Sequence, residues 1–160
     1  MLLHLLRHAD AGDPMSWDGP DAARPLSDKG RAQAKRLGKF LSGIKFGGEP
    51  FLTSPKVRAA QTAEAVAKPL GGTVVVDDRL ASGLTVRTIE AILKDAGDPE
   101  RPVLVGHDPD FSEMLATLCG APEIEMRKGA IARIEIDRPL RAGAGTLRWL
   151  LPPDVLKPER

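Results

Sequence analysis

The sequence predicts an α/β fold: a single three-layer α/β/α domain with a mostly parallel central sheet and an antiparallel edge. Short apolar runs alternate with stretches whose apolar residues recur at helical spacing, which is typical of a parallel sheet with helices on both faces. Residues 131–137 instead alternate with period two, and residues 146–151 resemble a hairpin partner for them. The 160 residues contain no internal repeat or linker, so we expect one domain over residues 1–160.

The individual elements follow from local composition and from helix-capping and turn residues. Strands are expected at Leu2–Leu6, Pro50–Ser54, Thr73–Val76, Val103–Val105, 131–137 and Thr146–Leu151. Helices are expected from the N-cap Ser27 to about Leu41, from Pro55 to the region of Pro69, over Val86–Leu93 and over Phe111–Leu118. The segment 10–25 is rich in Asp, Gly, Pro and Ala and predicts a long loop, a feature that is often functional in a compact domain.

Composition narrows the class of protein. The chain is 42% hydrophobic and 28% charged, which is ordinary for a globular protein, and its net charge of +1 gives no strong field toward nucleic acid or a membrane surface. A single cysteine, Cys119, excludes an internal disulfide. The short apolar start is broken by His4 and ended by Arg7, unlike a signal peptide, and no stretch approaches the ~20 apolar residues of a membrane span. We therefore expect a cytoplasmic protein with no nucleic-acid or membrane partner.

Charged and titratable residues follow several of the expected strands. Arg7 and His8 follow the first strand, Arg58 comes shortly after the second, and His107 follows the strand 103–105. Ligands bind at the carboxyl ends of strands in such sheets, so we expect these four side chains to meet. His4 lies inside the first strand and is expected to be structural.

Two arginines and two histidines suit a phosphoryl group. The planar guanidinium matches phosphate oxygens and keeps its charge at neutral pH, and fixed cations assist phosphoryl transfer. A neutral His8 can attack phosphorus and form a covalent phosphohistidine, while His107 hydrogen-bonds the oxygens. Each residue alone has an ordinary structural interpretation. A metal site would need three or four close ligands, and the spacing of Cys and His residues does not indicate one.

Three segments resemble the histidine phosphatase superfamily, also called phosphoglycerate-mutase-like. They read LLRHADAG, TSPKVRAAQTAEAV and VLVGHDPDF, and they occur in the order typical of that family. The resemblance implies that His8 is the phosphorylated nucleophile, that Arg7 and Arg58 bind phosphate, and that His107 is the second histidine of the pocket. It also implies that neither a metal nor an organic cofactor is required.

Within the superfamily, the chain resembles the small SixA-type phosphohistidine phosphatases. It is short, it has no inserted cap region, and its segments 24–27 (RPLS) and 106–109 (GHDP) are similar to that group. The resemblance implies a substrate that is a phosphorylated protein domain, or else a small phosphorylated metabolite. From its place in the long loop, Arg24 is a further candidate for substrate binding. The oligomeric state is left open.

Two departures from the family pattern bear on function. Relatives that hydrolyse phosphate esters carry an acidic proton donor after the third strand, whereas this chain has no Glu there, and Asp78 or Asp108 would have to serve. Phosphohistidine needs such an acid less, because imidazole leaves readily. Ala9 stands where the family has glycine, and a positive φ there would strain it. Three hypotheses result: a phosphohistidine phosphatase, a phosphatase of small phosphate esters, or a non-catalytic phosphate-binding module.

Overall fold

A six-stranded sheet forms the centre of the protein in the computed structural model, which describes residues 1–158. The strand order is β3-β2-β4-β1-β5-β6, with β3, β2, β4 and β1 parallel, β5 antiparallel to β1, and β6 antiparallel to β5. The strands are β1 (Leu2–Arg7), β2 (Phe51–Thr53), β3 (Val74–Val76), β4 (Val103–Gly106), β5 (Ile131–Glu135) and β6 (Thr146–Leu151). The predicted mostly parallel sheet with an antiparallel edge is confirmed.

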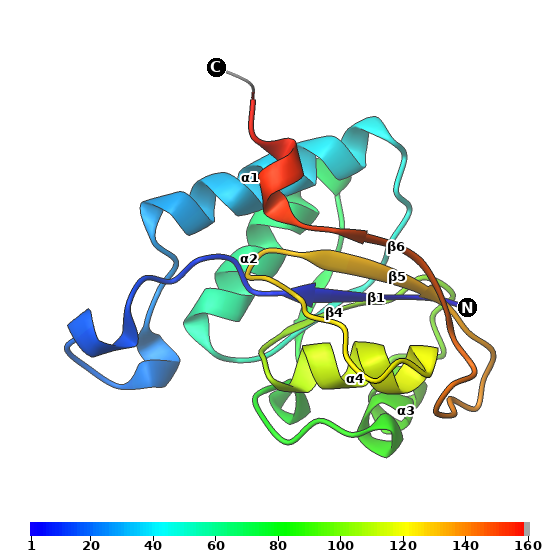
Figure 1. Ribbon diagram of the computed structural model, residues 1–160. Coiled ribbons are helices and arrows are strands. Elements are labelled where there is room, and N and C mark those ends of the chain that lie inside the picture. The colour runs from blue at the N-terminus through cyan, green and yellow to red at the C-terminus, as the bar shows by residue number, and fades with distance from the viewer. Residues whose placement is uncertain (159–160) are drawn as a thin grey trace.

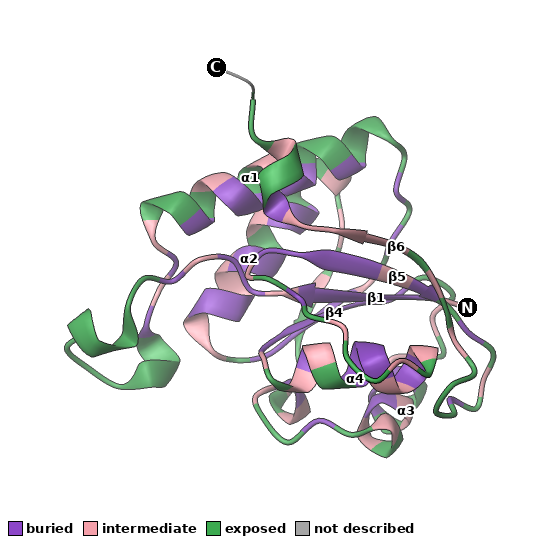
Figure 2. Ribbon diagram, in the orientation of Figure 1, coloured by how far each residue is buried: buried purple, intermediate pink, exposed green. Residues whose placement is uncertain are grey.

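Helices cover both faces of this sheet, as the sequence predicts. They are α1 (Asp28–Gly43), α2 (Val57–Ala67), α3 (Val86–Asp95) and α4 (Asp110–Cys119). Figure 1 shows α1 and α2 on one side of the strands and α3 and α4 on the other. Leu3 and Leu5 of β1 pack with the second helix pair, whereas Leu6 packs with the first, so alternate residues of one strand serve two apolar clusters. Figure 2 shows β1, β4 and β5 buried between these layers.

The helix after β2 begins later than the sequence predicts. We expected Pro55 to start it, but α2 starts at Val57, and Lys56 is its extended N-cap. The Ser54 hydroxyl accepts a hydrogen bond from the Lys56 N–H at 3.2 Å, which makes a local turn before the helix. This turn places Arg58 in the first turn of α2.

The long loop between β1 and α1 is fastened at its base. The Ser27 N–H donates to the Asp10 carbonyl at 3.0 Å, and the Ser27 hydroxyl donates to the Asp10 carboxylate at 2.6 Å. Gly30 lies so close that a Cβ there would stand 1.9 Å from the Asp10 carbonyl oxygen, so this position requires glycine. The loop, whose two short 3₁₀ turns are Pro14–Ser16 and Asp21–Ala23, then projects beyond the carboxyl end of β1 (Figure 1).

His4 is a structural residue, because both of its ring nitrogens have partners within the protein. Its Nδ1 lies 3.0 Å from the Pro102 carbonyl oxygen, and its Nε2 accepts from Arg133 Nε at 2.9 Å. The edge of the fully buried ring contacts Phe46, with ring centroids 4.5 Å apart. These contacts need a neutral imidazole with its proton on Nδ1, since a carbonyl only accepts.

The first prediction concerns pH and stability. Burial lowers the pKa of His4 to about 4, against the opposing effect of the Pro102 hydrogen bond. In the unfolded chain the pKa is about 6.5, so the stabilisation is complete above that pH and is lost as the pH falls toward 4. We expect the free energy of unfolding, measured by urea denaturation, to decrease over this range by an amount on the order of a few kcal/mol for His4.

The comparison variant is His4→Gln, whose amide does not titrate. His8 and His107 also have lowered pKa values, so wild type and variant will both lose stability in acid. The free energy of unfolding of the variant should nevertheless decrease less than that of wild type between pH 6.5 and 4. Equal losses in the two proteins would show that His4 does not contribute to the pH dependence.

Candidate active site

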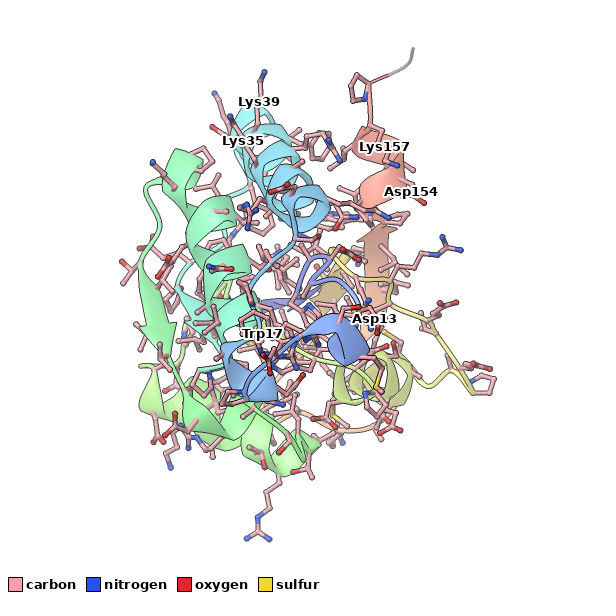
Figure 3. All side chains as sticks on the ribbon, turned by 90° about the vertical axis from the view of Figure 1, so that its left-hand side faces the viewer. Asp13, Trp17, Lys35, Lys39, Asp154 and Lys157 are labelled. Atoms are coloured by element: carbon pink, nitrogen blue, oxygen red, sulfur yellow. The ribbon has the colours of Figure 1, made fainter. Side chains whose placement is uncertain are left out.

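The predicted site residues lie at the carboxyl edge of the three parallel strands β1, β4 and β2. Arg7 pairs with Gly106 across β1 and β4, and the His8 N–H donates to the Gly106 carbonyl at 2.9 Å. His107 therefore lies next to His8, with ring centroids 5.2 Å apart. Figure 3 views the molecule from this edge, with the loop that carries Asp13 and Trp17 toward the viewer. The pairing of parallel strands thus brings the two histidines together.

Arg58 joins them from the first turn of α2, where its side chain is buried. Thr62, one turn further along, donates its hydroxyl to the Arg58 carbonyl at 2.8 Å and accepts the Ala9 N–H at 3.0 Å. The start of α2 is in this way bonded to the residue that follows His8. Arg7, His8, Arg58 and His107 come together as the sequence predicts, whereas their chemical roles stay predictions.

The ring of His8 is held in the tautomer that a nucleophile needs. Its Nδ1 lies 2.7 Å from the Ala9 carbonyl oxygen, which only accepts, so Nδ1 carries the proton and Nε2 keeps its lone pair. Burial lowers the pKa of His8 to about 4, assisted by the charges of Arg58, Arg7 and Lys128 and opposed by the Ala9 hydrogen bond. The imidazole is therefore neutral at pH 7.

His107 has one ring nitrogen with a partner and one without. Its Nε2 lies 2.8 Å from the Ser54 hydroxyl, whereas its Nδ1 is buried without a partner. Burial, followed by the neighbouring His8, Lys56 and Arg58, lowers the pKa of His107 to about 3. A bound anion acts in the opposite direction and favours a charged imidazolium, so His107 is able to gain a proton when a phosphoryl group arrives.

Both arginines are held by their far ends and leave Nε unused. Arg7 NH1 donates to the Met126 carbonyl at 2.7 Å and lies 3.3 Å from Asp108 Oδ2. Arg58 donates from NH1 to the Asp21 carbonyl at 2.9 Å and from NH2 to Asp21 Oδ2 at 3.0 Å. The Nε atoms of both arginines are buried without a partner.

Unpaired buried polar atoms are concentrated at this site. Over residues 1–158 the buried side-chain nitrogen and oxygen atoms without a partner are Arg7 Nε, Arg36 Nε, Arg58 Nε and His107 Nδ1, so three of the four belong to the predicted pocket. Leaving one such group unpaired costs about 1–3 kcal/mol, so their concentration in one place is expected only where a ligand completes them. The two buried guanidinium N–H groups that lack acceptors indicate an anion.

The other residues named from the sequence have mixed outcomes. Arg24 is buried beside the pocket, but its Nε donates to Asp21 at 3.3 Å and its NH1 to the Ala11 carbonyl at 2.7 Å. A direct contact between Arg24 and substrate stays a prediction. Asp78 is exposed at the start of a 3₁₀ turn, whereas Asp108 lies at the site beside Arg7.

Ala9 does not carry the strain that a positive φ would impose. The non-glycine residues with positive φ within residues 1–158 are Lys45 and Asp98, so Ala9 has an ordinary backbone. Its methyl group is fully buried in the cluster under α1 and α2. The substitution of the family glycine is therefore accommodated as apolar packing.

Sequence reasoning missed three residues that shape the site. Ser54, Thr62 and Asp21 contact His107, Ala9 and Arg58 respectively. Ser54 and Thr62 lie within the quoted segment TSPKVRAAQTAEAV, so their place in that motif was the available signal. Asp21 is one of several acidic residues in an irregular loop, and nothing in its local sequence distinguishes it.

In the described part of the chain, no three His, Cys, Asp or Glu side chains gather to hold a metal ion. No helix in that part is long and apolar enough to cross a membrane.

The sequence also matches a known protein family. A family model described as the histidine phosphatase superfamily (branch 1) matches residues 3–83, which contain Arg7, His8 and Arg58. The chain belongs to the histidine phosphatase superfamily. The family that the three sequence segments indicate is thereby confirmed.

Known proteins match the chain over nearly its whole length. An uncharacterized protein of Picosynechococcus sp. is 36% identical, covering 95% of this chain and 100% of that protein. The phosphohistidine phosphatase SixA of Escherichia coli (strain K12) is 29% identical, covering 98% of this chain and 97% of its own length. The structure of the protein histidine phosphatase SixA complexed with tungstate is 28% identical, with a TM-score of 0.84 over 98% of this chain and 100% of that one.

The second prediction tests the anion pocket. Replacing Arg58 with Ala removes the unused Nε edge, and a charge-assisted hydrogen bond contributes about 1.5–3 kcal/mol. The dissociation constant for inorganic phosphate, measured by isothermal titration calorimetry, should therefore rise about 10- to 100-fold.

Arg148→Ala is the matched control. Arg148 is an exposed arginine that pairs with Glu135, at the end of the sheet opposite Arg7. We expect it to leave phosphate affinity unchanged. Equal affinities in Arg58→Ala and wild type would mean that the unpaired donors do not form a phosphate site.

Proposed function

We propose that this protein is a phosphohistidine phosphatase, which hydrolyses a phosphoryl group from a protein histidine through a phosphorylated His8. The observation that carries the proposal is the arrangement around His8 Nε2. This atom keeps its lone pair because Nδ1 faces the Ala9 carbonyl, and the neighbouring Arg7, Arg58 and His107 each carry a buried nitrogen without a partner. A nucleophile without a proton next to unused cationic donors suits attack on a phosphoryl dianion.

The reaction has two steps in this geometry. In the first, His8 Nε2 attacks phosphorus, the P–N bond of the substrate breaks, and the departing imidazole nitrogen takes up a proton from solvent water. In the second, water attacks phosphorus, the bond to His8 Nε2 breaks, and inorganic phosphate leaves with the neutral imidazole restored. The Ala9 carbonyl, 2.7 Å from Nδ1, holds the ring in place throughout.

The guanidinium groups supply the positive charge that phosphoryl transfer requires. Charge spreads over the equatorial oxygens in the transition state, and we assign the Nε atoms of Arg7 and Arg58, which have no partner in the protein, to those oxygens. His107 Nδ1 provides a further contact. Because these side chains carry out the roles of charge neutralisation and orientation, we propose that the reaction needs no metal ion.

The carboxylates near the site favour a phosphoramidate over an ester. An ester needs an acid for its alkoxide, but Asp77 is paired with Arg79, and Asp78 is exposed. Asp108 accepts hydrogen bonds from the Ser112 N–H and hydroxyl, and its Oδ2 also lies near Arg7. Its oxygens therefore act as acceptors. The full-length match to the SixA phosphohistidine phosphatase supports the same substrate class.

A phosphatase of small phosphate esters is the second candidate. It would use Asp108, whose Oδ2 lies 3.3 Å from Arg7 NH1, as the proton donor to the alkoxide, although its acceptor contacts with Ser112 disfavour that role. An 8-oxo-(d)GTP phosphatase of Mycolicibacterium smegmatis is 27% identical, although this chain spans about half (48%) of its length. The third hypothesis, a non-catalytic module, rested on backbone strain at Ala9. Ala9 has no positive φ, so that support is absent.

The third prediction concerns substrate preference. An alkyl phosphate ester needs an acid for its alkoxide, whereas imidazole leaves without a dedicated one. The protein should therefore hydrolyse a phosphohistidine-bearing protein domain with a higher kcat/KM than glycerol phosphate. Release of inorganic phosphate is measured for both substrates, with and without EDTA. Faster turnover of the ester would contradict the substrate class, and loss of activity in EDTA would contradict the metal-independent reaction.

The fourth prediction concerns the nucleophile. His8→Ala should abolish turnover and phosphate incorporation, because no other group replaces Nε2. Rapid quenching of wild type with radiolabelled phosphohistidine domain should trap a phosphoenzyme that is labile in acid and stable in base. Cys119→Ser serves as the control for a thiol nucleophile and should behave like wild type. Substantial turnover by His8→Ala would exclude His8 from this role.

A further inference from the structure

The carboxylate of Asp21 lies between two buried arginines. Its Oδ2 accepts from Arg58 NH2 at 3.0 Å, and its Oδ1 accepts from Arg24 Nε at 3.3 Å. The Asp21 carbonyl also accepts from Arg58 NH1 at 2.9 Å. One residue of the long loop thus holds Arg58 at two points, while the Asp21 side chain itself stays half exposed.

Arg24 fixes this residue to the rest of the loop. Its NH1 donates to the Ala11 carbonyl at 2.7 Å, close to the end of β1. The pKa of Asp21 is lowered: partial burial acts to raise it, but the hydrogen bonds and charges of Arg58 and Arg24 outweigh that effect. Asp21 is therefore a fixed anion at neutral pH and holds its place between the two guanidiniums.

The contacts made by Asp21 leave one edge of Arg58 free. A guanidinium has five N–H donors, and Asp21 uses one on NH1 and one on NH2. The remaining Nε–H and the second NH2 hydrogen point in parallel along the other edge, and Nε is buried without a partner. That edge has the fork geometry that binds two phosphate oxygens. Asp21 therefore contacts Arg58 through NH1 and NH2 and does not use Nε.

A carboxylate near an anion site can act in two opposing ways. Its charge repels a bound phosphate, but its hydrogen bonds hold Arg58 in one orientation. The repulsion acts through solvent around a half-exposed side chain, where it is weak and screened by salt. The hydrogen bonds act directly on a buried guanidinium. The orienting effect is therefore the larger of the two.

We propose that Asp21 is a positioning residue that orients Arg58, so that the free Nε edge of Arg58 meets the phosphoryl oxygens. This inference rests on the proposed function, because it assigns Arg58 to phosphate. Asp21 lies outside the three sequence segments typical of the family, so the proposal adds a residue that those segments do not contain. Part of the geometry of the pocket then depends on an acidic residue in the loop between β1 and α1.

The test measures tungstate affinity of the purified full-length protein by isothermal titration calorimetry, which needs no turnover. Asp21→Asn should raise the dissociation constant about tenfold, the usual scale for loss of a group that orients a ligand-binding residue. Asp21→Glu keeps the charge but displaces it, and it should also weaken binding. Tighter binding by Asp21→Asn would overturn the proposal and show that repulsion prevails.

A double-mutant cycle with Arg58→Ala separates positioning from general damage. If Asp21 acts through Arg58, Asp21→Asn should change tungstate affinity less than twofold in the Arg58→Ala background. The same tenfold loss in that background would overturn the proposal. Thermal unfolding of each variant checks that the loss does not follow from instability, and Asp21→Glu supplies the comparison if Asp21→Asn is unstable.

Asp18→Asn is the matched control, because Asp18 is an exposed acid three residues away in the same loop. It should bind tungstate like wild type, whereas an equal loss would overturn a specific role for Asp21. A wild-type protein that binds no tungstate would instead contradict the proposed phosphate pocket itself. Wild-type binding with an unaffected Asp21→Asn would leave the proposed function standing and overturn this inference alone.

Discussion

The parallel pairing of β1 with β4 is the constraint on which the site depends. Because Arg7 and Gly106 are paired at the carboxyl ends of these strands, the chain leaves both strands at the same edge, and His8 and His107 emerge side by side. The His8 N–H bond to the Gly106 carbonyl extends the pairing by one residue into the site. An antiparallel arrangement would place the two histidines at opposite ends of the sheet.

Burial makes the two histidines of the site neutral, whereas the two arginines keep their charge. Both imidazoles are nearly buried among cations, and burial is the largest cause of their lowered pKa values, so they are neutral and their ring nitrogens are available. Arg7 and Arg58 stay charged and are fixed by acceptors at Met126, Asp108 and Asp21. The site thus places neutral imidazole nitrogens beside positively charged guanidiniums. A dianionic phosphoryl group suits such a site, because attack needs an uncharged nucleophile and the oxygens need positive charge.

Much of this arrangement was predictable from the sequence because it follows from position along the strands. Once β1, β2 and β4 are recognised as parallel, Arg7, His8 and His107 must share an edge, and a helix after β2 brings Arg58 to them. The turn that delays α2 to Val57 was not predictable, because it depends on one hydrogen bond to Ser54. The tautomer of His8 likewise depends on the direction of the Ala9 carbonyl, which no local pattern encodes. Asp21 was missed since contacts between an irregular loop and a distant helix leave no periodic signal.

The loop between β1 and α1 shows how irregular structure acquires a defined role. The Asp10–Ser27 bonds close its base, and the close approach of Gly30 to Asp10 fixes where α1 begins. From that base the loop folds back to Arg58, while Met15, at 90% exposure, and Trp17 remain on its outer side. The inner side of this segment holds Arg58 through the Asp21 carbonyl and carboxylate, beside the carboxyl edge of the sheet. One covalent segment therefore presents an exposed surface on one side and holds an arginine of the candidate site on the other, which explains physically how a loop without regular structure acquires a defined geometry.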